Sequence, residues 1–136
     1  MKYLIIWLIS FIAISSVDAI WHLVIFRKRY AAEFKKVAEI KNGKVVIKPL
    51  PGILSQIAVV TSIMMITLLA YNLGATTLIT AVLGALAGVL AISGYGLVNY
   101  SLIKGWSADI TLLEVIWGPI IGTFSGLLIV YLYNIL

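Results

Sequence analysis

Four long apolar stretches alternate with short polar segments along this chain. They cover about residues 3–26, 52–71, 75–103 and 110–135, and each has 20 or more residues. A helix rises about 1.5 Å per residue, so each stretch can cross a hydrocarbon core of about 30 Å. Apolar and polar residues do not alternate within them, which favours helices over β-barrel strands. The pattern predicts an all-α integral membrane four-helix bundle, one domain over residues 1–136.

The composition fits a protein of the bilayer. Hydrophobic residues make up 62% of the 136 residues and charged residues 11%, whereas soluble domains carry about 25% charged residues. The chain has no cysteine, which excludes disulfides, thiol catalysis and cysteine-ligated metal centres. His22 is the one histidine, so a site built from several histidines is excluded too. We therefore expect no cofactor.

The first apolar stretch also resembles a secretory signal peptide. Lys2, the apolar run 4–14 and the small-residue segment 17–19 resemble the parts of a signal peptide with its cleavage site. The apolar run continues through residues 20–26, which is longer than the apolar core of a signal. We expect this segment to be retained as the first span.

The basic residues predict an orientation. Eight of the ten Lys and Arg residues lie between the first two spans, in the loop 27–50. Lys104 follows the third span, and Lys2 alone lies at the opposite end. Because basic loops stay in the cytoplasm, we expect both termini outside and the loop 27–50 in the cytoplasm of a multi-pass cell-membrane protein. The same clustering accounts for the net charge of +5, so no nucleic-acid partner is expected.

The loop 27–50 contains the one sizeable polar segment. Residues 27–38 have a helical composition and are read as an extension of the first helix. Asn42-Gly43 lies between two short β-prone runs, which predicts a β-hairpin within residues 39–46. The loop either docks lipid headgroups or a partner protein, or is a solvated segment whose lysines set the topology. We favour the interpretation as a solvated segment.

Glycines recur at a spacing of four in the third and fourth spans. The predicted packing residues are Gly84, Gly88, Gly118, Gly122 and Gly126. This spacing stacks glycines on one helix face, where they let two backbones approach closely. The sequence leaves open whether the two faces pack on each other or one awaits another protein. Pro119 should bend the last helix beside its first glycine.

Polar side chains from all four spans gather toward the end that bears the basic loop. The candidate binding cluster is Asp18, Trp21, His22, Gln56, Tyr95, Asn99, Glu114 and Trp117. Helical spacing puts Asp18 and His22 on one face, and places Tyr95 and Asn99 on the glycine face of the third span. Glu114 continues the glycine stripe of the last span. These side chains should therefore point into the bundle, with the two tryptophans as pocket walls.

Three segments carry a family resemblance. Residues 95–99 read Tyr-Gly-Leu-Val-Asn, residues 104–106 read Lys-Gly-Trp, and residues 113–118 read Leu-Glu-Val-Ile-Trp-Gly. They resemble the domain of unknown function 2177 family, whose pattern is Tyr-Asp-Leu-Thr-Asn, Gly-Trp and Asp-x-x-Trp-Gly. The segment 18–21 is similar to the family's first-helix Asp-x-x-Trp. The resemblance implies a small four-helix membrane protein and lends it no activity. Gly96 replaces one of three family acids, so a three-carboxylate chemistry would be missing here.

The cluster supports three chemical interpretations. Asp18 and His22, with Glu114, could form a carboxylate–imidazole metal site, although we expect no metal. The same residues could couple a solute to proton movement. In the interpretation that we favour, Asp18 anchors a structural hydrogen-bond network with His22, Tyr95 and Asn99, while Glu114 reaches the membrane interface.

Three functional hypotheses follow. The first is a non-catalytic accessory or structural subunit that packs through its glycine faces, with membrane lipid and other membrane-protein subunits as partners. The alternative is a small proton-coupled transporter, or a lipid- or solute-binding protein, that uses the polar cluster. The weakest is a lipid-phase enzyme with Asp18 and Glu114 as acid and base, so no catalytic residue is assigned.

Overall fold

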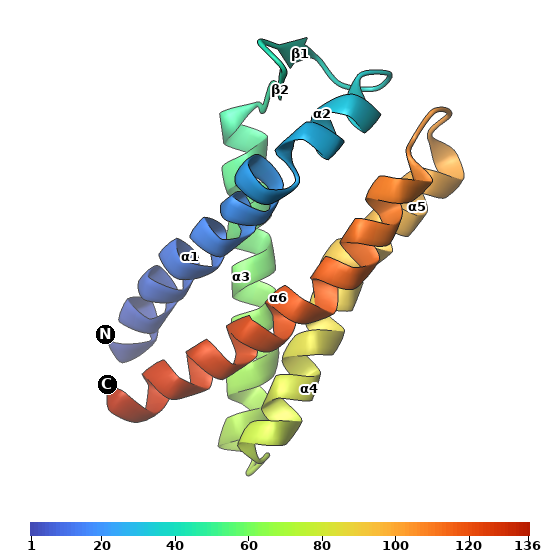
Figure 1. The fold of residues 1–136 in the computed structure, drawn as a ribbon. Coiled ribbons are helices and arrows are strands. Elements are labelled where there is room, and N and C mark those ends of the chain that lie inside the picture. The colour runs from blue at the N-terminus through green and yellow to red at the C-terminus, as the bar shows by residue number, and fades with distance from the viewer.

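The computed structural model describes all 136 residues and consists almost entirely of helices (Figure 1). The elements are α1 (Lys2–Ile20), η1 (Trp21–Ile25), α2 (Arg27–Phe34), β1 (Ile40–Lys41), β2 (Lys44–Val45), α3 (Pro49–Asn72), α4 (Thr77–Gly88), η2 (Val89–Ser93), α5 (Gly94–Leu102) and α6 (Ala108–Ile135). Both η elements are single π-helical turns.

Four continuous helices are long and apolar enough to cross a membrane, as the hydrophobic pattern predicts. They are Lys2–Ile25, Pro49–Asn72, Thr77–Leu102 and Ala108–Ile135. Only 28 of the 136 residues are buried, and most large apolar side chains lie on the outside of the bundle. That distribution suits a molecule whose surroundings are lipid, because an outward Leu or Ile then faces hydrocarbon.

Local sequence explains where the spans begin. α3 starts with Pro49, and proline is tolerated in a first turn because the N–H groups there have no helical partner. The side chain of Thr76 accepts the N–H of Ile79 at the start of α4, at 3.3 Å. Ser107 caps α6 in the same way through the N–H of Ile110, also at 3.3 Å.

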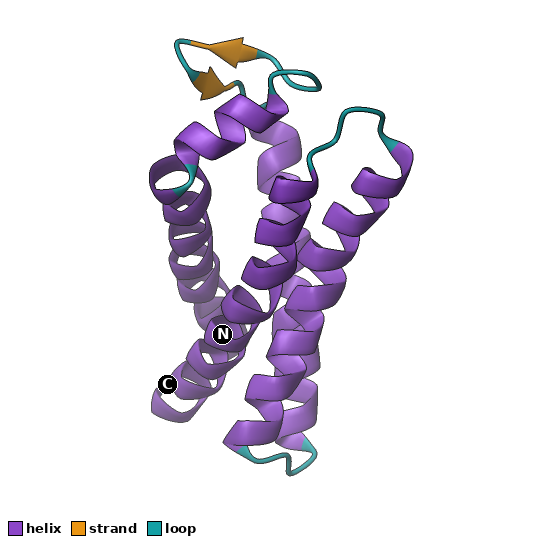
Figure 2. Ribbon diagram, turned by 45° about the vertical axis from the view of Figure 1, so that its right-hand side comes forward, coloured by secondary structure: helices purple, strands orange, loops and turns teal.

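The connections lie at two ends of the bundle. α2, the β-hairpin and the α5–α6 turn lie at one end, which we call the loop end (Figures 1 and 2). The α3–α4 turn and both termini lie toward the other, the terminal end. There the Nζ of Lys2 lies 4.2 Å from the ring centroid of Tyr133. Which end faces the cytoplasm stays a prediction from the basic loop.

The predicted hairpin in the loop is confirmed. β1 and β2 pair antiparallel, with Ile40 opposite Val45. Asn42 and Gly43 turn the chain with φ of 52° and 69°, the left-handed region that asparagine and glycine enter most easily. Residues 27–34 are helical, as their composition predicts, but the interpretation of the segment 27–38 as an extension of the first helix is wrong. Phe26, with φ −103° and ψ 12°, interrupts the helix, so α2 is a separate element.

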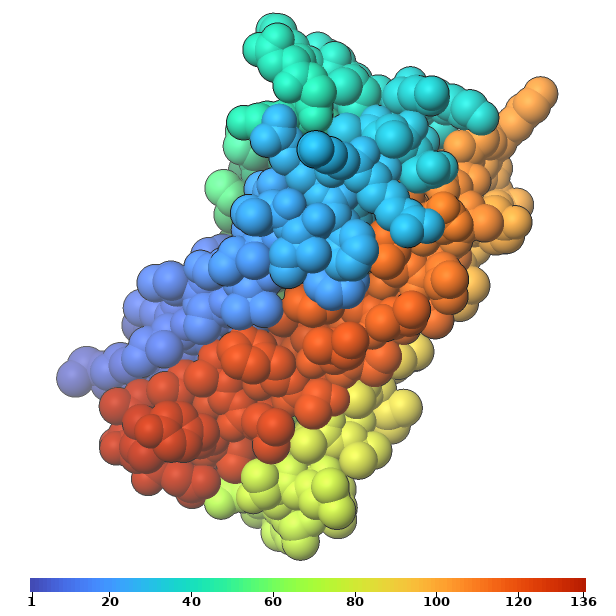
Figure 3. Space-filling model, viewed as in Figure 1, coloured from blue at the N-terminus to red at the C-terminus, as the bar shows by residue number.

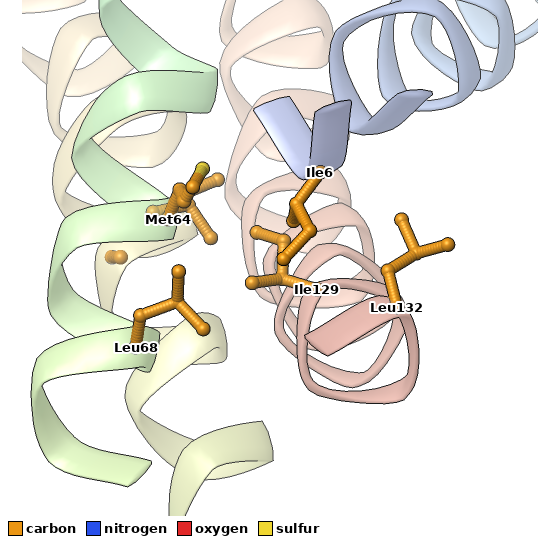
Figure 4. Close-up of a cluster of buried hydrophobic side chains, with 7 residues drawn as sticks. Ile6, Met64, Leu68, Ile129 and Leu132 are labelled. Carbon is orange, nitrogen blue, oxygen red and sulfur yellow. The ribbon is translucent and has the colours of Figure 1, made fainter. Parts of the chain in front are cut away.

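The apolar core of the terminal end joins all four spans, with Ala87 contributed by α4. Ile6 of α1, Met64 and Leu68 of α3, and Ile129 and Leu132 of α6 pack into one cluster (Figure 4). All five are at least nine-tenths buried. This cluster fixes the terminal halves of the spans against one another.

The glycines of α4 and α6 face each other across the tightest contact of the molecule. A Cβ atom on Gly88 would overlap the carbonyl oxygen of Gly118, and one on Gly84 would overlap that of Gly122. The Cβ on Gly84 would also lie 3.2 Å from the Cα of Gly126. Side chains larger than hydrogen do not fit between these backbones. Both glycine faces are therefore occupied within this chain.

Ser93 and Pro119 mark the point where this contact ends. A proline at position 119 has no N–H to donate to the carbonyl of Val115. The hydroxyl of Ser93 donates toward that carbonyl at 3.3 Å and toward the carbonyl of Glu114 at 3.2 Å. A Cβ on Gly118 would overlap the Ser93 hydroxyl, so glycine is needed there for this approach. Ser93 thus supplies the donor that the proline lacks.

Candidate functional site: a polar cavity at the loop end

A cavity of about 470 Å³ lies among the spans toward the loop end. Its polar wall is formed by Asp18, His22, Ser55, Gln56, Tyr95 and Glu114. Its apolar wall includes Ile14, Val59, Ile92 and Ile121. Small-molecule sites commonly occupy about 300–1,000 Å³ with a few convergent polar groups in an apolar wall. The cavity therefore has the size and lining of a binding site.

Asp18 holds the centre of a hydrogen-bond network that joins three spans. The indole N–H of Trp117 donates to its Oδ1 at 2.8 Å, and the amide of Gln56 donates to its Oδ2 at 2.7 Å. The Nδ1 of His22 lies 3.4 Å from Oδ1, and the Asp18 side chain is 16% exposed. An intramembrane carboxylate needs such donors to offset its lost hydration.

His22 links the two acids of the cavity. Its Nδ1 lies 2.8 Å from the backbone carbonyl oxygen of Asp18. Its Nε2 lies 3.4 Å from the Oε1 of Glu114. Both ring nitrogens face oxygen atoms, so the imidazole donates at both positions only when both carry protons. Asp18, His22 and Glu114 form a continuous acid–imidazole–acid chain.

Glu114 keeps one carboxylate oxygen free. Its Oε1 accepts the hydroxyl of Tyr30 at 2.8 Å as well as facing His22, and its side chain is 13% exposed. No group of the chain donates to its Oε2. The hydroxyls of Tyr95 and Ser55, which also line the cavity, have no hydrogen-bond partner in the chain. These groups can receive a ligand without breaking an existing contact.

Tyr30 extends from α2 to Glu114 in the lining of the cavity. Its side chain is 5% exposed although it lies outside the spans. Burial raises the pKa of the Tyr30 phenol above its ordinary value of about 10, and the negative charge of Glu114 and the hydrogen bond to it raise this pKa further. The phenol therefore remains a protonated donor to Glu114.

The charge of the cavity is negative. Asp18 and Glu114 carry a formal charge of −2 when ionised, and His22 offsets at most one of these charges. No Lys or Arg lines the cavity. No group of three or more His, Asp or Glu side chains is arranged to hold a metal ion, so the metal interpretation has no geometric support. A cation with N–H donors matches this lining better than an anion does.

Both π-helical turns lie at the cavity. His22 belongs to η1, and Ala91 and Ile92 of η2 line the wall. A π turn inserts one residue into an α-helix and is frequent at functional sites. Each insertion shifts the helix face that follows it. These two turns had no recognisable signal in the sequence.

Five of the eight candidate polar residues line the cavity: Asp18, His22, Gln56, Tyr95 and Glu114. Asn99 does not; it is 8% exposed, and its amide nitrogen has no partner. Trp21 and Trp117 are not walls of the cavity but stack on each other, with ring centroids 4.2 Å apart at 10°.

The favoured hydrogen-bond network was right for His22, whose Nδ1 lies 3.4 Å from the Oδ1 of Asp18, and wrong for its other two partners. Asp18 bonds Gln56 and Trp117 rather than Tyr95 and Asn99. The side chain of Glu114 does not extend away from the bundle, because Tyr30 and His22 hold its Oε1.

Sequence reasoning missed two functional positions. Tyr30 lies in a segment that we expected to be solvated, and nothing in its neighbours reveals its partner. Ser93 had a signal, because Pro119 leaves a carbonyl of the last span without its donor. A search for a hydroxyl at the same depth of the neighbouring span would have found it.

A comparison with protein families gives one match. The family described as predicted membrane protein (DUF2177) matches residues 3–131, nearly the whole chain. No curated protein and no solved structure matches the chain.

Proposed function

Because the chain belongs to the DUF2177 family of predicted membrane proteins, we propose a role inside the bilayer: it binds a small cationic group in the cavity between its spans. The group is an amine whose N–H donors meet the carboxylates of Asp18 and Glu114. The observation that carries this proposal is the free Oε2 of Glu114 in a cavity of about 470 Å³ without a Lys or Arg. A carboxylate in such surroundings gains most from a ligand that brings both charge and donors.

The acid–imidazole–acid chain supports coupling to protons. A cation that binds beside Glu114 makes proton loss from the chain more favourable, because it takes over the charge that a proton supplied. Binding and proton release are then linked, as a coupled transporter requires. We include proton-coupled movement of the amine as an extension of this proposal.

The accessory-subunit hypothesis loses its main support. It rested on the small polar part of the chain, on the missing family acid and on glycine faces that another span could use, and Gly84 and Gly88 lie against Gly118 and Gly122 within the chain. No other feature of the fold favours it. We propose neither that role nor an enzymatic one.

The test uses two small probes of equal length, propylammonium and 1-propanol. Propylammonium should raise the thermal stability of the purified protein in detergent, by about 1.4 kcal/mol at tenfold over its Kd. 1-Propanol should have no such effect, because it carries no charge. Short chains are chosen so that neither probe acts as a detergent.

Three variants and one matched control locate the effect. Asp18→Asn and Glu114→Gln should abolish stabilisation by propylammonium, and Glu39→Gln is the matched control because Glu39 is an exposed acid outside the cavity. Tyr95→Phe removes a free hydroxyl from the lining, is expected to fold, and should weaken binding only. Equal effects of the two probes on the wild type would overturn the proposal.

A further inference from the structure

We propose that the amine belongs to a lipid, whose headgroup enters the cavity sideways from the bilayer between α3 and α5. This inference rests on the proposed function and names the class of its ligand. The shared chemistry is a primary ammonium group, which a membrane lipid or a water-soluble amine could supply. Four features of the structure favour the lipid: the place of the opening, the closed loop end, the depth of the site and the distribution of charge.

The opening lies between two spans. Three residues of the lining are exposed: Pro51 and Ser55 in the first turns of α3, and Tyr95 of α5, which is 62% exposed. The lining residues of α1, η1 and α6 are buried or half-buried. The mouth of the cavity is therefore bordered by α3 and α5 and faces the surroundings of the bundle, which are lipid at this depth.

α2 closes the loop end above the cavity. Tyr30 donates to Glu114, and the guanidinium of Arg29 lies 2.6 Å from the carboxylate of Asp109. Further along α2, Phe34 packs on Trp106 with ring centroids 5.2 Å apart. On the face that α1, α2 and α6 form, α2 lies against the loop-end half of α6 (Figure 3), and the hollow of about 540 Å³ between α2 and the α5–α6 turn shares no lining residue with the cavity. A ligand from the aqueous phase would have to displace α2.

The mouth lies at headgroup depth. Tyr95 precedes the end of α5 at Leu102 by seven residues, and Ser55 follows the start of α3 at Pro49 by six. Both therefore lie within about 10 Å of the loop end of their spans. Spans of this length extend a few ångströms beyond a hydrocarbon core of about 30 Å. The mouth is then next to the headgroups and first acyl carbons of one leaflet.

The distribution of charged residues matches the two charged groups of a phospholipid headgroup. The cavity offers Asp18 and Glu114 to an ammonium group and no cation to a phosphate. Exposed basic residues lie where the two bordering helices meet the loop end: Lys48 directly precedes α3, and Lys104 follows α5. Basic side chains at that level attract phosphate. An aminophospholipid fits this arrangement with its ammonium inside, its phosphate at the mouth and its acyl chains in the bilayer.

The experiment compares two lipids with identical acyl chains. The protein is reconstituted in vesicles of equal parts phosphatidylethanolamine and phosphatidylcholine, extracted in a mild detergent, and analysed for retained lipid by native mass spectrometry. Phosphatidylethanolamine offers N–H donors and phosphatidylcholine does not. We expect about a tenfold preference for phosphatidylethanolamine, which corresponds to one charge-assisted hydrogen bond. Glu114→Gln should lose the preference, and Glu39→Gln, at an exposed acid outside the cavity, should retain it.

A thiol placed at the mouth tests the route. The chain has no cysteine, so Ser55→Cys introduces a unique thiol on the bordering helix. Modification with a bulky maleimide should abolish the preference for phosphatidylethanolamine. The control is Ser101→Cys, an exposed position of α5 outside the cavity, which should retain it after the same treatment.

The outcomes separate the two proposals. Equal retention of the two lipids, with stabilisation by propylammonium intact, overturns the lipid inference and leaves the proposed function standing. A preference that survives the maleimide at position 55 overturns the lateral route. Loss of both the lipid preference and the response to propylammonium overturns the proposed function as well.

Discussion

The third and fourth spans meet in two different ways along their length. In the terminal half, α4 and α6 lie so close that a Cβ on Gly88 would overlap the backbone of Gly118. In the loop half, Tyr95 of α5 and Glu114 of α6 line a cavity of about 470 Å³. The same two spans thus form a closed contact at one end and a polar site at the other.

The change from one to the other occurs over a few residues. η2 alters the helical register directly after Gly88, and Pro119 interrupts the hydrogen bonds of α6 directly after Gly118. The Ser93 hydroxyl then joins the two spans at this level. We call this level the junction. The close glycine packing on its terminal side fixes the position of the polar groups on its loop side. The comparison predicts large effects from substitutions in the closed half and smaller ones at the junction.

The largest effect is expected in the glycine contact. Gly88→Ala should lower the free energy of unfolding by about 3 kcal/mol, because its Cβ meets the backbone of Gly118, which cannot move without separating α4 from α6. The matched control is Gly94→Ala in the same span, where the nearest atom to a Cβ is the carbonyl oxygen of Val89 at 3.6 Å. It should be neutral or stabilise by up to about 1 kcal/mol.

Thermal unfolding in detergent measures both variants. Similar losses in Gly88→Ala and Gly94→Ala would mean that the contact is no tighter than the rest of the span. The comparison between the two halves would then fail.

The next effect concerns the hydrogen bonds of the polar half. Trp117→Phe keeps an aromatic ring on Trp21 but removes the N–H that Asp18 accepts at 2.8 Å. A hydrogen bond to a charged group contributes about 1.5–3 kcal/mol, and we expect a loss of stability in that range. Trp7→Phe is the control, because its N–H donates to the neutral hydroxyl of Thr61 at 3.0 Å.

Trp7→Phe should cost about 1 kcal/mol. Equal losses in the two variants, measured by denaturant unfolding, would show that Asp18 does not act as a charged acceptor. The polar half would then be held together like the apolar one.

The pH dependence of stability tests the contact between Tyr30 and Glu114. The pKa of Tyr30 is raised, so the native state holds this proton more tightly than the unfolded state does. The contribution of this proton to the free energy of unfolding is complete below the ordinary tyrosine pKa of about 10. It falls as the pH rises above that value, by about 1.4 kcal/mol at pH 11. The difference in free energy of unfolding between wild type and Tyr30→Phe should shrink by this amount between pH 9 and pH 11. That amount corresponds to the release of about one more proton by the unfolded state than by the native state.

The other six of the seven tyrosines are common to both proteins, so the difference isolates Tyr30. A constant difference across the pH range would mean that the phenol is not held beside Glu114. Removing Asp109 as the partner of Arg29 should leave the pH dependence unchanged, because that ion pair is exposed.

Length and apolarity made the spans predictable, and Asn42-Gly43 made the hairpin predictable, because both signals are local. The partners of Asp18 were not predictable, because they depend on how four helices are rotated against one another. Asn99 shows the reason most clearly. Its assignment, together with Tyr95, to the face of Gly88 assumed an unbroken α-helical spacing, and the π turn η2 rotates the segment that holds both residues by about 100° relative to the glycine face.

One departure from the family pattern also gains a spatial meaning. A Cβ on Gly96 would lie 3.1 Å from the Cβ of Glu114. An acid at this position, as in the pattern that residues 95–99 resemble, would lie directly beside the carboxylate that remains. Sequence comparison alone identifies the missing acid but not its neighbour.

The smallest effect is expected at the junction itself. Ser93→Ala removes the donor to the carbonyls of Glu114 and Val115, and we expect a loss of about 1 kcal/mol. In a Pro119→Ala background, the new backbone N–H at position 119 can donate to Val115, so the same Ser93→Ala change should have a much smaller effect.

A double-mutant cycle on Ser93 and Pro119, measured by thermal unfolding, gives the coupling between them. A coupling of about 0.5–1 kcal/mol shows that the hydroxyl compensates for the proline. Additive losses would mean that Ser93 stabilises the junction by packing alone, since its burial at 2% exposure is the same in both backgrounds. The position of α6 at the junction would then be maintained by the glycine contact alone, and the polar half would depend on the closed half for its shape.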